Sequence, residues 1–172
     1  MEPKFKIPTE SVELPSKGKF YPEGHPLKGG TVEMKYMTAK EEDILTNQNY
    51  IQKGIVIDKL LQSLLVTEFN YDDLLIGDKN AIMVAARILS YGKDYDIEYN
   101  GQKITVDLSE VKEKVSEDAT PNESGDFTFT LPKSGNEVTF KLLTHGDDKK
   151  IDREVEGLKK INRDNVIEKL LQ

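Results

Sequence analysis

Apolar and polar residues alternate over Thr31–Met37, which is the pattern of a strand with one buried face. The next four residues, Thr38-Ala-Lys-Glu41, form a capping box. In such a box the threonine hydroxyl and the glutamate carboxylate bind free backbone N–H groups at the start of a helix. We therefore expect a strand, followed at once by a short helix that runs through Leu45.

Two longer segments have the spacing of amphipathic helices. In Ile55–Val66, apolar residues recur every three or four positions and make a wide apolar stripe. The second helix is predicted after Gly77, over Lys79–Tyr91, with Asp78 as its N-cap and Gly92 as its stop.

Two hairpins are predicted further along the chain. The segment Tyr95–Leu108 alternates on both sides of Asn100-Gly101, a pair that adopts the positive φ angles of a two-residue hairpin turn. A second alternating pair of arms spans residues 127–142, with a turn around Gly135.

The chain ends in segments with helical spacing. One begins near Asp147 and carries Ile151, Val155 and Leu158. A last helix could begin at Asp164, and its apolar residues are Val166, Ile167, Leu170 and Leu171.

These patterns predict an α+β fold. A small, mostly antiparallel sheet, which includes Thr31–Met37 and the Tyr95–Leu108 hairpin, packs on two amphipathic helices, with an appended β-hairpin and C-terminal helices. The predicted regions are an extended Pro/Gly-rich arm, the α+β core, a charged linker, and the hairpin with C-terminal helices. They cover residues 1–30, 31–109, 110–126 and 127–172 respectively. The prolines of the arm argue against a long helix or a central strand there.

Composition narrows the possible chemistry. The 172 residues include 24 Lys and Arg against 31 Asp and Glu, a formal charge of −7, which disfavours sequence-independent binding of nucleic acid. The absence of cysteine excludes disulfides, zinc ribbons and thiol nucleophiles. His25 and His145 are interpreted as turn residues, so we expect no metal site and no cofactor. No signal-peptide pattern or apolar stretch of membrane-spanning length is present, which predicts a soluble intracellular protein without a membrane partner.

The paired acids allow an enzymatic alternative. Asp72-Asp73 and Asp147-Asp148 are interpreted as solvated acids near helix starts, where the helix dipole favours them. Gly77-Asp78-Lys79 lacks the rest of a phosphate-binding loop. The alternative function is a small acidic hydrolase or nucleotide-binding protein that uses Asp72, Asp73 and Lys79.

Arg87 interrupts an otherwise apolar helix. A guanidinium near a packed face needs a partner or access to the rim. We expect a structural ion pair with Glu41, Glu42 or Asp43, and a substrate clamp is the weaker alternative.

Three segments are predicted to bind a partner protein: the arm, the second hairpin and the last helix. The alternative to partner binding is that all three segments pack on the chain's own core. No catalytic residue is expected. The predicted partner-binding residues are Leu14, Pro15, Phe20, Tyr21, Phe127, Phe129, Val166, Ile167, Leu170 and Leu171.

Several motifs, in this order, resemble the baseplate hub protein family of T-even-type contractile-tailed bacteriophages. The resemblance spans Leu14 to about Thr144. It rests on Leu14-Pro-Ser-Lys-Gly-Lys-Phe-Tyr-Pro22, Met37-Thr-Ala-Lys-Glu-Glu-Asp-Ile-Leu45, Leu75-Ile-Gly-Asp-Lys-Asn-Ala81, Tyr91-Gly-Lys-Asp-Tyr95 and the segment Phe129–Pro132.

The resemblance implies a non-enzymatic late protein that helps to build the central hub of the tail baseplate. Members act as hub subunits or as assembly chaperones, so it implies other baseplate hub proteins as partners and no small-molecule substrate. The expected location is the cytoplasm of the infected bacterial host during assembly, or the virion tail. A cellular adaptor or secretion-machine component outside phages is the remaining alternative.

Overall fold

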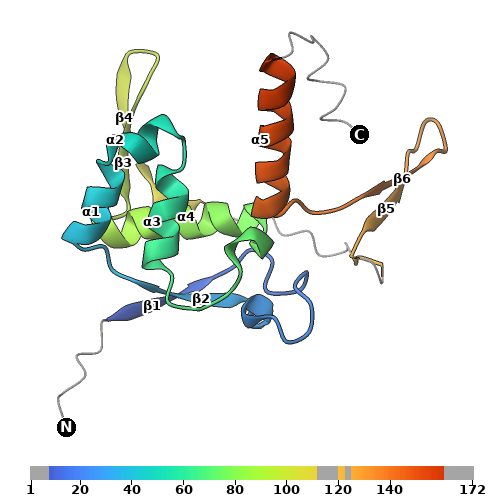
Figure 1. Cartoon of the computed structure of the whole chain (residues 1–172), viewed down its shortest axis with the longest axis horizontal. Helices are drawn as coiled ribbons and strands as arrows, with labels where there is room; N and C mark the ends of the chain where they lie inside the picture. The colour runs from blue at the N-terminus through green and yellow to red at the C-terminus, as the bar shows by residue number, and fades with distance from the viewer. Residues whose placement is uncertain (1–7, 112–119, 123–124, 161–172) are drawn as a thin grey trace. The chain divides into compact units, whose positions relative to one another are not determined.

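The structure is a computed structural model that describes residues 8–111, 120–122 and 125–160 (Figure 1). The chain divides into two compact units. Unit 1 comprises Met1–Phe69 and Gly77–Thr120, and unit 2 comprises Asn70–Ile76 and Pro121–Gln172. The predicted α+β class is confirmed, because helices combine with three antiparallel two-stranded sheets. Residues 8–30, which were predicted to form a separate arm because of their prolines, belong to unit 1. Residues 70–76 belong to unit 2.

The first sheet of unit 1 pairs β1 (Thr9–Glu13) with β2 (Thr31–Lys35). The strands are antiparallel and Val12 lies opposite Val32. The strand β1 was not predicted because Pro8 and Pro15 flank it, but proline argues only against a central strand and β1 is an edge strand.

The opposite edge of β2 is also covered. The backbone N–H of Val66 donates to the carbonyl of Glu33 at 2.9 Å, and the N–H of Glu33 donates to the hydroxyl of Thr67 at 2.9 Å. The 95–108 hairpin, which was predicted to belong to the same sheet, forms a separate two-stranded sheet.

Helices α1 (Ala39–Leu45) and α3 (Val56–Leu64) of unit 1 begin and end close to their predicted limits. Helix α4 (Ile76–Tyr91) ends where predicted but begins before Lys79, and its first residue belongs to unit 2. Helix α2 (Gln48–Gln52) was not predicted. Helix α3 buries Leu60, Leu61 and Leu64, which confirms the predicted apolar stripe. A 3₁₀ turn, η1 (Pro26–Gly29), precedes β2.

A buried carboxylate ties three elements of unit 1 together. Glu41 is fully buried and accepts hydrogen bonds from the Lys35 amine at 2.8 Å and the Ser63 hydroxyl at 2.7 Å. The N–H of Thr38 also donates to it at 3.0 Å, which confirms the capping box. Burial raises the pKa of Glu41, but hydrogen bonds from Lys35, Thr38 and Ser63 outweigh this and lower it to about 2.

The second sheet of unit 1 is the hairpin of β3 (Asp94–Tyr99) and β4 (Gln102–Asp107). Its turn residues Asn100 and Gly101 have φ angles of 51° and 75°, so the predicted Asn-Gly turn is confirmed. A 3₁₀ turn, η3 (Leu108–Glu110), follows.

Unit 2 contains η2 (Tyr71–Asp73), β5 (Phe127–Thr130), β6 (Glu137–Phe140) and α5 (His145–Lys160). The second predicted hairpin and the helix near Asp147 are thus confirmed. Residues distant in the sequence meet here: the N–H of Ile76 donates to the carbonyl of Leu143 at 3.0 Å, and the N–H of His145 donates to that of Leu74 at 2.8 Å. The amine of Lys149 binds Asp72 at 2.9 Å.

Candidate protein-interaction surfaces

The loop after β1 is anchored to α4 through Asp78. One carboxylate oxygen of Asp78 accepts the N–H of Ser16 at 3.0 Å, and the other accepts the hydroxyls of Ser16 and Tyr21, each at 2.7 Å. The side chain of Asp78 is buried. Because α4 begins at Ile76, the prediction that Asp78 is the N-cap was wrong; its carboxylate binds the loop instead.

This anchoring buries two residues that were predicted to bind a partner. Leu14 is 1% exposed and Tyr21 is 4% exposed, so the prediction that they form a surface for another protein is wrong. Pro15 and Phe20 are partly exposed. In a loop too short to form a core, apolar side chains have packed on the chain's own core, which was the stated alternative.

Arg87 binds the backbone at the C-terminal end of α4. Its guanidinium donates to the carbonyl of Gly92 at 2.9 Å and to that of Asp94 at 3.4 Å. It also lies over the rings of Tyr91 and Tyr95, at 5.1 and 5.5 Å from their centroids. A cation is favoured where a helix leaves carbonyl groups free, so this position satisfies Arg87 without a carboxylate.

The predicted ion pair of Arg87 with Glu41, Glu42 or Asp43 is therefore wrong: no salt bridge between described residues joins them, and Arg87 binds backbone carbonyls instead. Glu41 binds Lys35, Thr38 and Ser63, and Glu42 is an exposed residue of α1. The sequence could not reveal this, because Arg87 binds main-chain groups that every residue carries.

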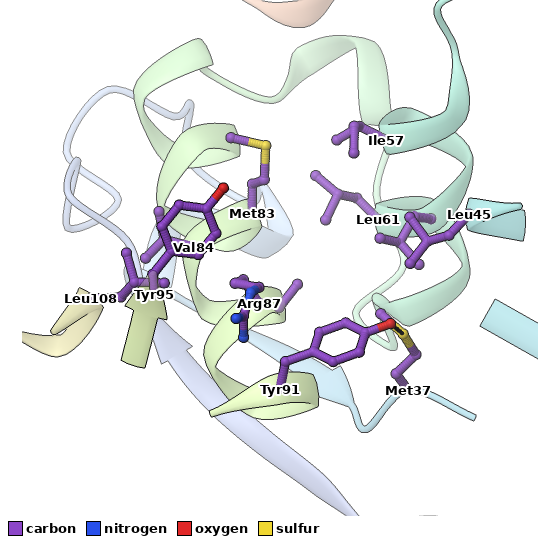
Figure 2. Close-up of a pocket in the computed structure, with 12 residues that line it drawn as sticks. Met37, Leu45, Ile57, Leu61, Met83, Val84, Arg87, Tyr91, Tyr95 and Leu108 are labelled. Carbon is purple, nitrogen blue, oxygen red and sulfur yellow. Dashed lines mark hydrogen bonds between the residues drawn. The ribbon is translucent and has the colours of Figure 1, made fainter. Parts of the chain in front are cut away.

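An apolar groove opens in unit 1, with α3 on one side and α4 on the other (Figure 2). Its volume is about 400 Å³. Figure 2 shows Ile57 and Leu61 on one wall and Met83 and Val84 on the facing wall. The only charged side chain among the lining residues is that of Arg87; the others are Met37, Leu45, Ile57, Leu60, Leu61, Met83, Val84, Ala86, Tyr91, Tyr95 and Leu108. The groove was not predicted, because it forms between helices whose packing a linear pattern does not specify.

The β3–β4 hairpin continues this apolar surface. Tyr95 lines the groove, and Ile97 and Tyr99 follow it on the same face of β3. Ile97 lies opposite Ile104 of β4. All four side chains are more than a third exposed, and Tyr99 is 64% exposed.

Unit 2 carries a separate apolar face on the β5–β6 hairpin. Phe127 stacks on Phe140, with ring centroids 5.5 Å apart, and Phe129 lies opposite Val138. Phe127 is buried, so the prediction that it binds a partner is wrong. Phe129, by contrast, is 55% exposed and Phe140 is 50% exposed. Leu131 and Leu142, which lie just beyond the strands, are exposed as well. An exposed apolar patch of this kind is typical of an interaction surface.

Asp72 and Lys79, two of the three residues of the enzymatic alternative, have structural partners. Asp72 pairs with Lys149 at 2.9 Å, and chiefly this hydrogen bond lowers the pKa of Asp72. Lys79 pairs with Asp58 at 2.7 Å. Asp72 and Asp73 belong to unit 2 and Lys79 to unit 1.

Two further observations concern only the described part of the chain. Within residues 8–111, 120–122 and 125–160, no group of three or more histidine, aspartate or glutamate side chains could hold a metal ion. None of the helices described there has the length and apolar character needed to span a bilayer. Most of the predicted linker 110–126 and the residues Val166, Ile167, Leu170 and Leu171 lie outside the described residues.

Comparison with known proteins gives the family. A family model described as T4 bacteriophage base plate protein matches residues 7–170. The chain belongs to the T4 bacteriophage base plate protein family. No curated protein sequence and no solved structure matches it. The family match confirms the resemblance to a T4-type phage baseplate protein, and it spans both units and all three sheets.

Membership gives the resemblance motifs a structural meaning. Ser16 and Tyr21 of the first motif bind Asp78 of the Gly-Asp-Lys motif, and Glu41 of the second motif is the buried carboxylate between β2, α1 and α3. These motifs of the base plate protein therefore hold unit 1 together. The candidate interaction surfaces of the protein are the groove with the β3–β4 face in unit 1 and the β5–β6 face in unit 2.

Proposed function

We propose that this baseplate protein is a non-enzymatic component of contractile tail assembly that docks onto baseplate hub proteins, either as a hub subunit or as a hub assembly chaperone. The observation that carries the proposal is the apolar face of the β5–β6 hairpin, where Phe129 and Phe140 are each at least half exposed. A partner protein would cover this face.

A two-stranded hairpin by itself is only marginally stable in water. Within the described part of the chain, β5 and β6 pair only with each other, so an outer strand edge could form main-chain hydrogen bonds with a strand of a partner. A partner that adds a strand at an edge, or packs on the apolar face, would stabilise the hairpin. This supports docking as the role of the hairpin.

The proposal that the protein is not an enzyme is supported by how its acids are used. Asp72 is paired with Lys149 and its lowered pKa keeps the carboxylate charged near neutral pH, where a general acid must carry a proton. Lys79 is paired with Asp58. The hydrolase or nucleotide-binding alternative predicts a loss of activity or nucleotide binding when Asp72, Asp73 and Lys79 are replaced by alanine.

The test is a pair of substitutions on opposite faces of one strand. Phe129→Asp places a charge on the apolar face, and Thr128→Asp places the same charge on the other face of β5. In phages that carry each variant, we expect Phe129→Asp to reduce the number of complete tails seen by electron microscopy, and Thr128→Asp to leave it near wild type. Normal tails with Phe129→Asp would contradict the proposal.

Mass spectrometry of purified tails separates the two roles. A hub subunit remains in the finished tail, whereas an assembly chaperone is present in assembly intermediates and absent from tails. Pull-down with the tagged wild-type chain and both variants should recover baseplate hub proteins, and only Phe129→Asp should lose them.

A further inference from the structure

The docking role proposed above uses the β5–β6 hairpin and does not involve the groove between α3 and α4. Its volume of about 400 Å³ lies in the range of ligand-binding sites, which is roughly 300–1,000 Å³. Its walls come from two helices, as Figure 2 shows for Ile57, Leu61, Met83 and Val84. Grooves of this type accept the apolar face of a helix, with anchors spaced by three, four and seven residues.

The rim of the groove has the composition of a binding surface. Tyr91, Tyr95, Met83 and Arg87 belong to the residue types that are enriched in protein interfaces. Met83 is 40% exposed, Tyr91 53% and Tyr95 45%. Methionine adapts its shape to a partner, and tyrosine and arginine supply much of the binding energy in many interfaces.

Arg87 determines the charge that the occupant should carry. A guanidinium has five N–H donors, and that of Arg87 binds the carbonyls of Gly92 and Asp94. No other charged side chain lines the groove. An occupant that was apolar throughout would remove water from the guanidinium N–H groups that these carbonyls do not bind, whereas a carboxylate would form charge-assisted hydrogen bonds with them.

We propose that this groove binds an amphipathic helix of a partner protein, with the apolar side chains of the helix in the groove and an aspartate or glutamate at its edge paired with Arg87. The proposal deepens the proposed docking function, but it concerns a different surface, in unit 1.

A helix fits the surface better than a lipid chain with a carboxylate. Sites for small apolar ligands bury most of the ligand. This groove is open at its rim and is continuous, through Tyr95, with the exposed face of Ile97, Tyr99 and Ile104. Such an open surface favours one side of a helix over an enclosed small ligand.

The first test measures peptide binding to the full chain. The probes are fluorescein-labelled overlapping peptides of about 20 residues, which span about 30 Å as helices, covering the baseplate proteins of the same phage. Fluorescence anisotropy should find a subset that binds with a Kd below about 100 μM. These peptides should carry apolar residues at helical spacing and an acidic residue beside them.

Matched variants locate the site. Met83→Glu adds a charge at the rim, and Ile51→Glu adds the same charge to α2, at a residue of similar exposure that does not line the groove. We expect Met83→Glu to weaken peptide binding about tenfold or more, because the new carboxylate would be buried against apolar side chains of the bound helix, and Ile51→Glu to leave it unchanged.

A charge exchange tests the role of Arg87. Arg87→Glu should weaken binding of the acidic peptide, and a peptide in which the acidic residue is replaced by lysine should bind this variant better than it binds the wild type. Binding of the lysine peptide also shows that the variant is folded.

Several outcomes would overturn the proposal. They are the absence of any binding peptide, equal binding to Met83→Glu, and binding that does not depend on the acidic residue. If peptides bind only a chain that ends at Lys160, the occupant is the chain's own last segment. If native mass spectrometry finds a fatty acid that competes with the peptides, the groove is a lipid site.

The two proposals can fail separately. If groove variants leave peptide binding intact while Phe129→Asp still blocks tail assembly, only the helix-binding proposal is wrong. If Phe129→Asp assembles normally while the groove binds peptides from baseplate proteins, the hairpin argument is wrong and the groove proposal stands.

Discussion

The hydroxyl of Tyr21 lies 2.7 Å from a carboxylate oxygen of Asp78, 57 positions further along the chain. Both side chains are buried, and the backbone and hydroxyl of Ser16 donate to the same carboxylate. Ser16 and Tyr21 thus supply three hydrogen-bond donors to this buried side chain. The contact holds the loop after β1 against the first turn of α4 within unit 1.

Removal of the Tyr21 hydroxyl should destabilise the protein. Tyr21→Phe leaves the buried carboxylate of Asp78 with one donor fewer, and we expect the free energy of unfolding to fall by about 2 kcal/mol in urea denaturation. The control is Tyr36→Phe, since the hydroxyl of Tyr36 donates to Glu10 at an exposed site. There the change should be below about 0.5 kcal/mol, and similar losses in both variants would contradict the role of Asp78.

A methyl group at position 18 should not fit. Gly18 has a φ of 73°, and a Cβ atom built there would lie 2.1 Å from the carbonyl oxygen of Lys28. Gly24 has a φ of 82° but open space around that position. Gly24→Ala should cost about 1 kcal/mol from backbone strain alone, and Gly18→Ala should cost clearly more, measured as a lower melting temperature. Equal costs would show that the loop adjusts freely.

Stability should fall in acid partly because of Glu41. Its pKa is about 2 in the folded chain and 4.5 ordinarily, so folding gains stability from the charged form above pH 4.5. That gain, about 3 kcal/mol, is lost as the pH falls from 4.5 towards 2. We expect Glu41→Gln to flatten the dependence of unfolding free energy on pH in this range.

Asp107 provides the comparison for this titration. Hydrogen bonds from Lys93 and Ser109 lower the pKa of Asp107 to about 2 as well, but the pair with Lys93 lies on an exposed hairpin. Water screens such a pair, so Asp107→Asn should alter the pH dependence much less than Glu41→Gln. A larger effect of Asp107→Asn would contradict the assignment to Glu41.

The final residues allow a prediction from sequence alone. Leu170→Asp combined with Leu171→Asp should weaken binding of hub proteins in a pull-down and leave the melting temperature almost unchanged, because apolar residues of the last segment are predicted to bind a partner. A large drop in melting temperature would instead place this segment in the core.

The local patterns predicted the elements well, because each depends on neighbours in sequence. The Asn100-Gly101 turn and the Thr38–Glu41 capping box follow from backbone geometry over a few residues. The apolar stripe of α3 follows from helical periodicity. The strand β1 was missed because its flanking prolines outweighed its short alternation.

The candidate surfaces depended on contacts that a pattern does not contain. Whether Tyr21 faces a partner or the core is decided by Asp78, and the partner of Arg87 is a pair of backbone carbonyls. The exposed face of Phe129 could be predicted, since alternation places it on one side of a strand. The groove could not, because its lining comes from α1, α3 and α4 together with Met37, Tyr95 and Leu108 from three further segments.

The inclusion of residues 70–76 in unit 2 has a consequence for synthesis on the ribosome. Leu74 and Ile76 form backbone hydrogen bonds with His145 and Leu143, which are translated about seventy residues later. A nascent chain therefore carries this segment without its partners while the remainder of unit 1 is being made. Unit 1 can form first, but unit 2 must wait until α5 has emerged, and a fragment ending before Leu143 would leave these backbone groups unpaired.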